Sequence, residues 1–198
     1  RIGKPRIAAL LGVRGTGLAM AVVGDWLIWL GEPEGGTSRL AVADLADADR
    51  PRWVSERQVI IDREVVSRAR PFVGANSRNV FVQGLAETAD GVGVTAFTVQ
   101  SDGQLVDDLA WMAALTAAPG IWSLPFAVHN LAVTDDWLLV QGVPGVTSVS
   151  LTEAGLPLRK ARWEQANGWQ PGSLRIAGGR SLAVQSGAVN GLLAVGGL

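Results

Sequence analysis

The chain contains no cysteine and only one histidine, His129, in 198 residues. Without cysteine it can form no disulfide, no thiolate metal site and no thiol nucleophile. A zinc site needs several histidine, cysteine or carboxylate ligands, and only carboxylates are plentiful here. His129 could act as a general base, but no serine or carboxylate motif accompanies it at a recognisable spacing. We therefore expect no metal, no cofactor and no enzymatic activity.

An excess of charge of one sign is also missing. The 17 basic and 18 acidic residues give a formal net charge of -1, whereas nucleic-acid-binding proteins usually show a clustered basic excess. Long apolar runs are absent too, because 25 glycines and 9 prolines interrupt a sequence that is 48% hydrophobic. A membrane-spanning helix needs about 20 consecutive apolar residues. We expect neither a nucleic-acid partner nor membrane insertion, and no signal-peptide pattern assigns a compartment.

What the chain does contain is one short pattern that occurs four times. Residues 19–30 are echoed by residues 72–83, 130–141 and 174–185. The equivalent points are Trp26, Asn79, Trp137 and Ser181. Short apolar strands that repeat about every 20 to 50 residues are typical of propellers and solenoids. The repeat therefore predicts an all-β fold.

The first copy shows how one unit is built. Residues 18–23 and 26–30 are apolar and flank Gly24-Asp25, a two-residue turn signal, so they predict a hairpin. Residues 39–45 predict a third strand, and a fourth begins at Arg52. In later copies the corresponding segments are 93–99 with 105–111, and 147–151 with 156–163.

A tryptophan stands in the last strand of three predicted units, at Trp53, Trp111 and Trp163. A bulky side chain at one position per unit predicts a wedge between adjacent sheets. Residues 107–115 also have the composition and spacing of a helix. For this segment, the strand and helix interpretations both remain open.

The first copy resembles the LVIVD-type β-propeller repeat. In that family a Gly-x turn precedes an aromatic-led strand, and a further strand leads to an Asp-Pro turn. Gly24 with Trp26, residues 40–45, and Asp47 with Pro51 stand in those places. The turns at residues 100–103 and 152–157 lack the Asp-Pro signature. The resemblance implies a bladed propeller, often exported or on the bacterial cell surface, with no common catalytic residues.

We predict a single domain over residues 1–198, a β-propeller of about four blades. The predicted repeats are approximately 13–59, 60–114, 115–165 and 166–198. The fourth copy offers strand segments only at 174–185 and 191–195, whereas residues 4–11 resemble residues 50–55. The N-terminal segment, residues 1–12, is therefore predicted to complete the last blade and close the ring. Alternatively, the four units belong to a larger propeller or to one shared in a dimer.

Four residues are candidate ligand-binding positions. Trp122 and Trp169 lie beside Pro119-Gly120 and Asn167-Gly168, which predict loops, whereas the other tryptophans are expected in the core. Arg14 lies in the glycine-rich segment 12–17, which matches no phosphate-binding fingerprint but could present this side chain to a channel. His129 is the fourth candidate. The aspartates at 44, 47 and 49 lack the calcium-loop pattern and are explained by turn formation.

These observations favour a non-enzymatic binding or scaffold module. We expect its partner to be another protein or subunit, and a homodimer is compatible with the repeat. The competing interpretation is an enzyme or a carbohydrate-binding lectin that uses the central channel or the loops between blades. An enzyme would gather polar groups from several blades at one channel mouth.

Overall fold

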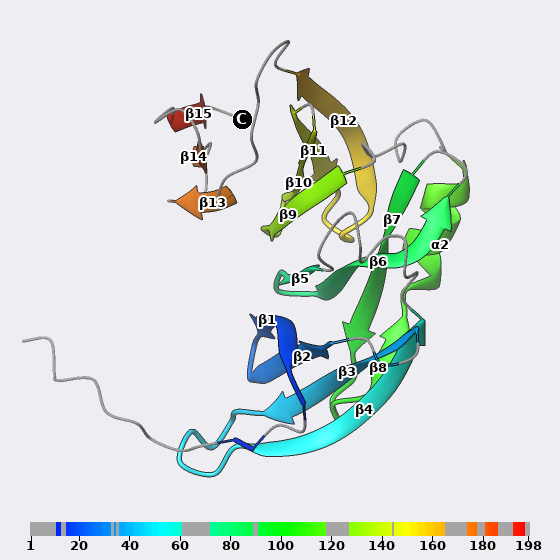
Figure 1. Ribbon diagram of the computed structural model, residues 1–198, viewed down its shortest axis with the longest axis vertical. Helices are drawn as coiled ribbons and strands as arrows, with labels where there is room; N and C mark the ends of the chain where they lie inside the picture. Colours follow the sequence, from blue (N-terminus) through cyan, green and yellow to red (C-terminus); the bar gives the residue numbers. More distant parts are fainter. Residues whose placement is uncertain are drawn as a thin grey trace, which may run out of the picture.

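A computed structural model describes residues 11–12, 15–32, 34, 36–60, 72–88, 91–117, 127–143, 145–164, 174–177, 181–185 and 192–196. These residues form four small antiparallel sheets that follow one another along the chain (Figure 1). The structure thus confirms the predicted all-β fold. None of the helices in this part of the chain is both long and apolar enough to cross a membrane.

Each sheet is built from strands that pair in the order of the sequence. The first sheet contains β1 (Gly17–Val23), β2 (Trp26–Gly31), β3 (Thr37–Asp44) and β4 (Arg52–Ile60). The second contains β5 (Phe72–Ala75), β6 (Asn79–Thr88), β7 (Gly91–Val99) and β8 (Leu105–Asp107). The third contains β9 (Ala127–Val133), β10 (Trp137–Val143), β11 (Gly145–Leu151) and β12 (Pro157–Glu164). The fourth contains β13 (Leu174–Ala177), β14 (Ser181–Gln185) and β15 (Leu192–Gly196).

The predicted register of the repeat is confirmed. The four equivalent points are each the first residue of the second strand of a sheet, namely Trp26, Asn79, Trp137 and Ser181. The first hairpin forms as expected, with Val23 paired to Trp26 across the turn at Gly24-Asp25. Gly24 has a φ of 54°, a left-handed conformation that glycine adopts at little cost.

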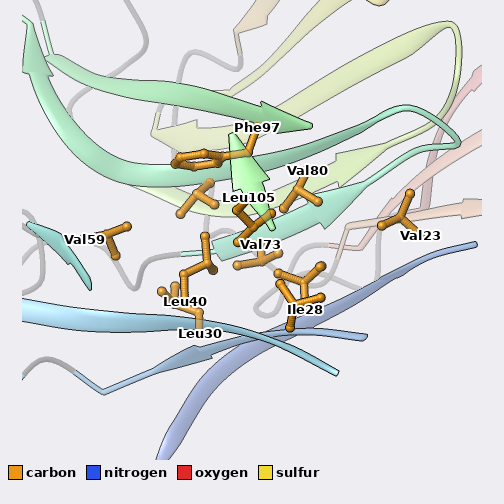
Figure 2. Close-up of a cluster of buried hydrophobic side chains, with 11 residues drawn as sticks. Val23, Ile28, Leu30, Leu40, Val59, Val73, Val80, Phe97 and Leu105 are labelled. Carbon is orange, nitrogen blue, oxygen red and sulfur yellow. The ribbon is translucent and has the colours of Figure 1, made fainter. Parts of the chain in front are cut away.

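The sheets pack face to face, with their first strands side by side. Strand β1 lies beside β5, β5 beside β9, and β9 beside β13. We call the face of a sheet that is turned toward the next sheet its forward face, and the opposite one its rear face. In the first core, Ile28, Leu30 and Leu40 from the forward face of the first sheet meet Val73 and Val80 from the rear face of the second (Figure 2).

The second core repeats this arrangement one sheet further along the chain. Phe81 and Ala96 on the forward face of the second sheet, together with Trp111, pack against Leu138 and Val149 on the rear face of the third. Polar contacts at the outer edge also join the first two sheets. Ser55 Oγ donates to the carbonyl oxygen of Gly103 at 2.6 Å.

The segment at residues 105–111 is not one strand. Strand β8 ends at Asp107, and helix α2 spans Leu109–Ala117. Asp108 begins the helix because its carboxylate accepts a hydrogen bond from the backbone N–H of Trp111 at 2.9 Å. The helix interpretation of this segment is therefore the correct one.

The prediction that these tryptophans occupy one structural position per unit is wrong for the same reason. Trp111 lies in α2 and is fully buried, whereas Trp53 lies in β4 and is half-buried. The two residues thus do not share one structural position. Trp163 lies in β12, and its side chain is outside the described part.

The last predicted unit also differs in detail. Residues 174–185 form two strands, β13 and β14, rather than one. Of the predicted N-terminal strand at residues 4–11, only Leu11 belongs to the described residues, and it is in no strand.

The turn between β9 and β10 carries one carboxylate with a shifted pKa. Hydrogen bonds from Ser77 hold the pKa of Asp135 below its ordinary value, and the nearby charge of Arg78 lowers it further. The backbone N–H of Ser77 donates to Asp135 Oδ1 at 2.8 Å, which joins the second sheet to the third. Ionised Asp135 therefore favours the folded state.

We expect this contribution to be full above about pH 4 and to be lost as the pH falls through the lowered pKa. The Asp135→Asn variant should therefore lose less stability between about pH 6 and pH 2.5 than the wild type. Thermal unfolding of both proteins across this range measures the difference. Identical pH profiles would show that the contact with Ser77 contributes nothing.

Candidate functional site

Large apolar side chains meet solvent on the rear face of the first sheet. Met20 pairs with Trp29 and Val22 pairs with Leu27 across β1 and β2, so all four side chains lie on one face. Leu27 is also in register with Ala43 and, through it, with Trp53 in β4. We call the surface formed by Met20, Val22, Leu27, Trp29 and Trp53 the open face.

The equivalent positions of the next two sheets are sheet-to-sheet contacts. Counting from the first residue of each second strand, Val22 corresponds to Ala75 and Val133, and both pack on the core of the preceding sheet. Val133 lies so close to β5 that a Cβ added at Gly74 would be 2.6 Å from its Cγ2 atom. These positions are therefore built to contact a neighbouring sheet.

Exposure separates the first sheet from the other two. Met20 and Val22 are 70% and 56% exposed. Val73, which corresponds to Met20, is only 7% exposed, and Leu138, which corresponds to Leu27, is fully buried. In the described part of the chain, the open face is thus a sheet-to-sheet contact surface without a covering sheet.

Two glycines leave the space that the Trp29 ring occupies on this face. Gly17 and Gly31 pair with each other at the ends of β1 and β2. A Cβ at Gly31 would lie 2.7 Å from Cη2 of Trp29, and a Cβ at Gly17 would be closer still to its Nε1 atom. Because only glycine leaves this space free, the indole ring can lie directly over the paired backbones.

Trp53 extends the aromatic surface to the outer strand. Its ring centroid lies 6.2 Å from that of Trp29, at an interplanar angle of 64°, an edge-to-face arrangement that is favourable for aromatic pairs. Its indole N–H donates to the carbonyl oxygen of Gly12 at 2.7 Å. The chain before β1 is thereby fixed at the outer strand β4.

Two hollows adjoin the tryptophans. One of about 410 Å³ is lined by Trp29, Trp53, Arg39 and Glu56 among others, and Arg39 Nε lies 3.4 Å from Glu56 Oε1. The other, of about 420 Å³, shares Trp29 and Arg39 and is also lined by Glu32, Glu34 and Gln58. The edge of the open face is thus charged with both signs, as the rim of a protein interface usually is polar.

The open face offers an aromatic and apolar contact surface with a charged edge. Within the residues that the structure describes, no three histidine, cysteine, aspartate or glutamate side chains are placed to hold a metal ion. The hollow beside Trp53 combines an aromatic pair with one ion pair. Such a set can bind a side chain or a small polar ligand.

None of the positions suggested by the sequence has a described side chain on this surface. Arg14, Trp122 and Trp169 lie outside the described residues. His129 lies in β9, between residues paired with Gln141 and Gly142, so the register shifts at this point. Its side chain is outside the described part, and its candidate role stays a prediction.

Sequence reasoning missed Trp29 and Trp53 because it placed both in the core. One signal could have found Trp29. The corresponding residues of the other copies are Val82, Val140 and Val184, so only the first copy carries an aromatic residue there. A larger side chain at this position indicates a different neighbour.

Comparisons with known proteins identify the fold but no family. The sequence matches no protein-family model and no curated protein. The structure is similar to a protein from Lactobacillus plantarum, with a TM-score of 0.57 and 14% identity over 94% of this chain and 57% of that chain. It is also similar to the computationally designed Ika4 protein, with a TM-score of 0.55 and 12% identity over 98% of this chain and 99% of that one. The chain thus spans little more than half of the Lactobacillus protein.

Proposed function

We propose that this chain is a non-enzymatic propeller module for protein-protein assembly, and that the open face is its docking surface. The observation that carries the proposal is the exposure of Met20 and Val22 at positions whose counterparts in the next two sheets contact a neighbouring sheet. The LVIVD-type resemblance of the first copy is part of the same proposal.

The energetics of the open face support docking. Burial of an aliphatic or methionine side chain contributes about 1.5–3 kcal/mol, and Met20 and Val22 are mostly exposed. Tryptophan is among the residues that most often dominate interface affinity. Trp29 and Trp53 stand beside the charged rim of Arg39 and Glu56. An apolar centre with a polar rim is the usual anatomy of a protein interface.

The proposal includes the N-terminal segment as the missing strand of the fourth sheet. In the described part that sheet ends at β15, whereas each of the other three has a fourth strand. The contact between Trp53 and Gly12 supports this placement, because the chain reaches the first strand β1 from the outer strand β4. A segment that arrives from the outer side is suited to supply the outer strand of the sheet that packs on the open face, which is the chain's own fourth sheet in a closed ring and a sheet of the partner in an assembly.

Two arrangements could cover the open face. In a closed ring of four sheets, the chain's own fourth sheet would pack on it. In an assembly, another polypeptide would do so. The exposure of Met20 and Val22 favours the assembly.

A carbohydrate-binding function is the second candidate. It is favoured by the hollow of about 410 Å³, where an aromatic pair lies beside an ion pair. Neither Met20 nor Val22 lines this hollow or the adjoining one. A variant at Val22 should therefore prevent assembly but leave sugar binding unchanged, which separates the two functions.

The stability of two matched variants tests the docking proposal. Val22→Asp and Ala75→Asp place the same carboxylate at equivalent positions of the first and second sheets. We expect Val22→Asp to lower the free energy of unfolding by less than about 1 kcal/mol, because the position is exposed. Ala75→Asp should cost about 2–4 kcal/mol, because the charge would be placed against the apolar core.

Urea denaturation at low protein concentration measures both values. The low β-propensity of aspartate affects the two variants alike and therefore cancels in the comparison. An equally large loss in both would show that the open face is covered within a single chain, which contradicts a docking role.

A further inference from the structure

We infer that Trp29 and Arg39 lie at the centre of a binding groove for a neutral oligosaccharide, which extends over both hollows beside the open face. This inference rests on the carbohydrate-binding candidate and deepens it. The site becomes longer than the hollow beside Trp53 alone, and the sugar that it binds carries no charge. Met20 and Val22 line neither hollow, so the docking function is tested separately.

Trp29 presents the face of its ring to the groove. A Cβ atom added at Gly31 would lie 2.7 Å from Cη2 and 2.8 Å from Cζ3 of Trp29, and one at Gly17 would lie 3.3 Å from Cε2. The ring thus lies along the sheet, with one face toward the paired backbones and the other turned away from them. A half-exposed indole in this position can stack on the C–H face of a sugar ring, because the face of an aromatic ring is electron-rich.

The first sheet carries larger residues at the groove than the next two sheets carry at the same positions. Trp29 stands where they have valine, and Arg39 stands where they have glycine. By register, the corresponding residues are Val82 and Gly93 in the second sheet, and Val140 and Gly145 in the third. Glycine lets a neighbouring backbone approach closely, whereas arginine does not. This part of the open face is therefore shaped for something other than close contact with a sheet.

The first hollow is a corner with two aromatic sides. Ala41 stands between Trp29 and Glu56 across the sheet and lines the hollow, so its small side chain leaves space above β3. Trp53 closes one side, at an angle of 64° to Trp29. The volume of about 410 Å³ lies within the range of ligand-binding pockets.

The polar groups of this corner suit hydroxyl groups. Arg39 Nε lies 3.4 Å from Glu56 Oε1, and both side chains are about half-exposed. A guanidinium group only donates hydrogen bonds and a carboxylate only accepts them, whereas a hydroxyl does both. Neighbouring hydroxyls of a sugar can therefore bind both side chains. An exposed ion pair contributes little to stability, so its two members remain available to a ligand.

The second hollow extends the groove and determines the charge of the ligand. It has a volume of about 420 Å³, shares Trp29 and Arg39 with the first, and adds Glu32, Glu34 and Gln58. Among the described residues, the two hollows together present one guanidinium group and three carboxylates. This excess of negative charge disfavours an anionic ligand, and Arg39 beside Trp29 disfavours a cation at the stacking position. A neutral ligand with many hydroxyls fits both hollows.

The first test is calorimetric titration of the full chain with neutral tetrasaccharides of glucose, mannose, galactose and N-acetylglucosamine. We expect at least one of them to bind, and to bind in preference to the anion tetragalacturonate and the cation spermidine. If no neutral tetrasaccharide binds, the inference is wrong. Preferential binding of tetragalacturonate would also overturn it but would leave a carbohydrate-binding function in place, whereas preferential binding of spermidine would overturn both.

The second test locates the sugar. Trp29→Val, which installs the residue of the other sheets, should weaken the binding of the preferred tetrasaccharide by about tenfold or more. Glu56→Gln changes only an exposed side chain and should weaken it by about threefold. Val22→Asp lies outside both hollows and should leave the affinity unchanged. Urea denaturation verifies that each variant is folded. Full affinity in Trp29→Val or Glu56→Gln would contradict the site.

The third test measures the length of the groove. The wild type should bind the tetrasaccharide more tightly than the disaccharide of the same sugar. Gln58→Ala changes the second hollow alone and should reduce this difference. Equal affinities for both sugars in the wild type would limit the site to the first hollow and contradict the longer groove. None of these outcomes decides the docking function, which depends on the comparison of Val22→Asp with Ala75→Asp.

Discussion

Replacement of Trp111 by alanine is expected to lower the free energy of unfolding by about 3–5 kcal/mol, as large-to-small changes of buried aromatic residues do. Trp111 is fully buried. Its ring packs edge-to-face on Phe81, with centroids 5.0 Å apart, and its indole N–H donates to the carbonyl oxygen of Val94 at 3.1 Å. The variant loses the packing and leaves this buried carbonyl oxygen without the indole donor.

The matched control is Leu109→Ala in the same helix. Leu109 is 76% exposed, and alanine is the better helix former, so we expect a change within about 0.5 kcal/mol. Urea denaturation of both variants measures the difference. If Trp111→Ala cost no more than Leu109→Ala, the helix would not belong to the core between the second and third sheets.

The hairpins and the register of the repeat could be predicted because they depend on neighbouring residues. The turn at Gly24-Asp25 lies between two apolar runs, and the sequence alone therefore indicates where Trp26 begins its strand. The same local pattern placed Asn79 and Trp137 at the starts of β6 and β10. The strand starts predicted from these local patterns are therefore the ones found in the structure.

Helix α2 could not be settled from the sequence because its residues suit a strand or a helix. Two features decide the outcome. Asp108 caps the helix, and Trp111 finds its partner Phe81 on a strand 30 residues away in the sequence. The second feature depends on which strands become neighbours, and the composition of the segment contains no information about that.

The candidate site was missed for a related reason. Apolar residues within predicted strands were expected in the core, so loop tryptophans such as Trp122 were favoured over Trp29 and Trp53. An apolar strand residue is buried only when another sheet covers its face. Leu138 has such a sheet and is buried, whereas Val22 has none in the described part and is exposed.

One pair of equivalent residues shows whether a sheet covers the rear face of the first sheet. Leu27 and Leu138 are equivalent leucines, each the second residue of the second strand of a sheet. Leu138 is fully buried against the second sheet, whereas Leu27 is only half-buried on the open face. The same substitution at both positions thus reports whether a sheet covers the surface.

The most direct test of the central claim is the stability of Leu138→Ala and Leu27→Ala, measured by urea denaturation at a protein concentration that keeps the chain monomeric. We predict a loss of about 2–5 kcal/mol for Leu138→Ala, because the substitution leaves a cavity between two packed sheets. Leu27→Ala should cost about 1 kcal/mol or less, because Leu27 is only half-buried and no sheet in the described part of the chain packs on it. Equal losses at the two positions would contradict the claim that the rear face of the first sheet is an uncovered docking surface.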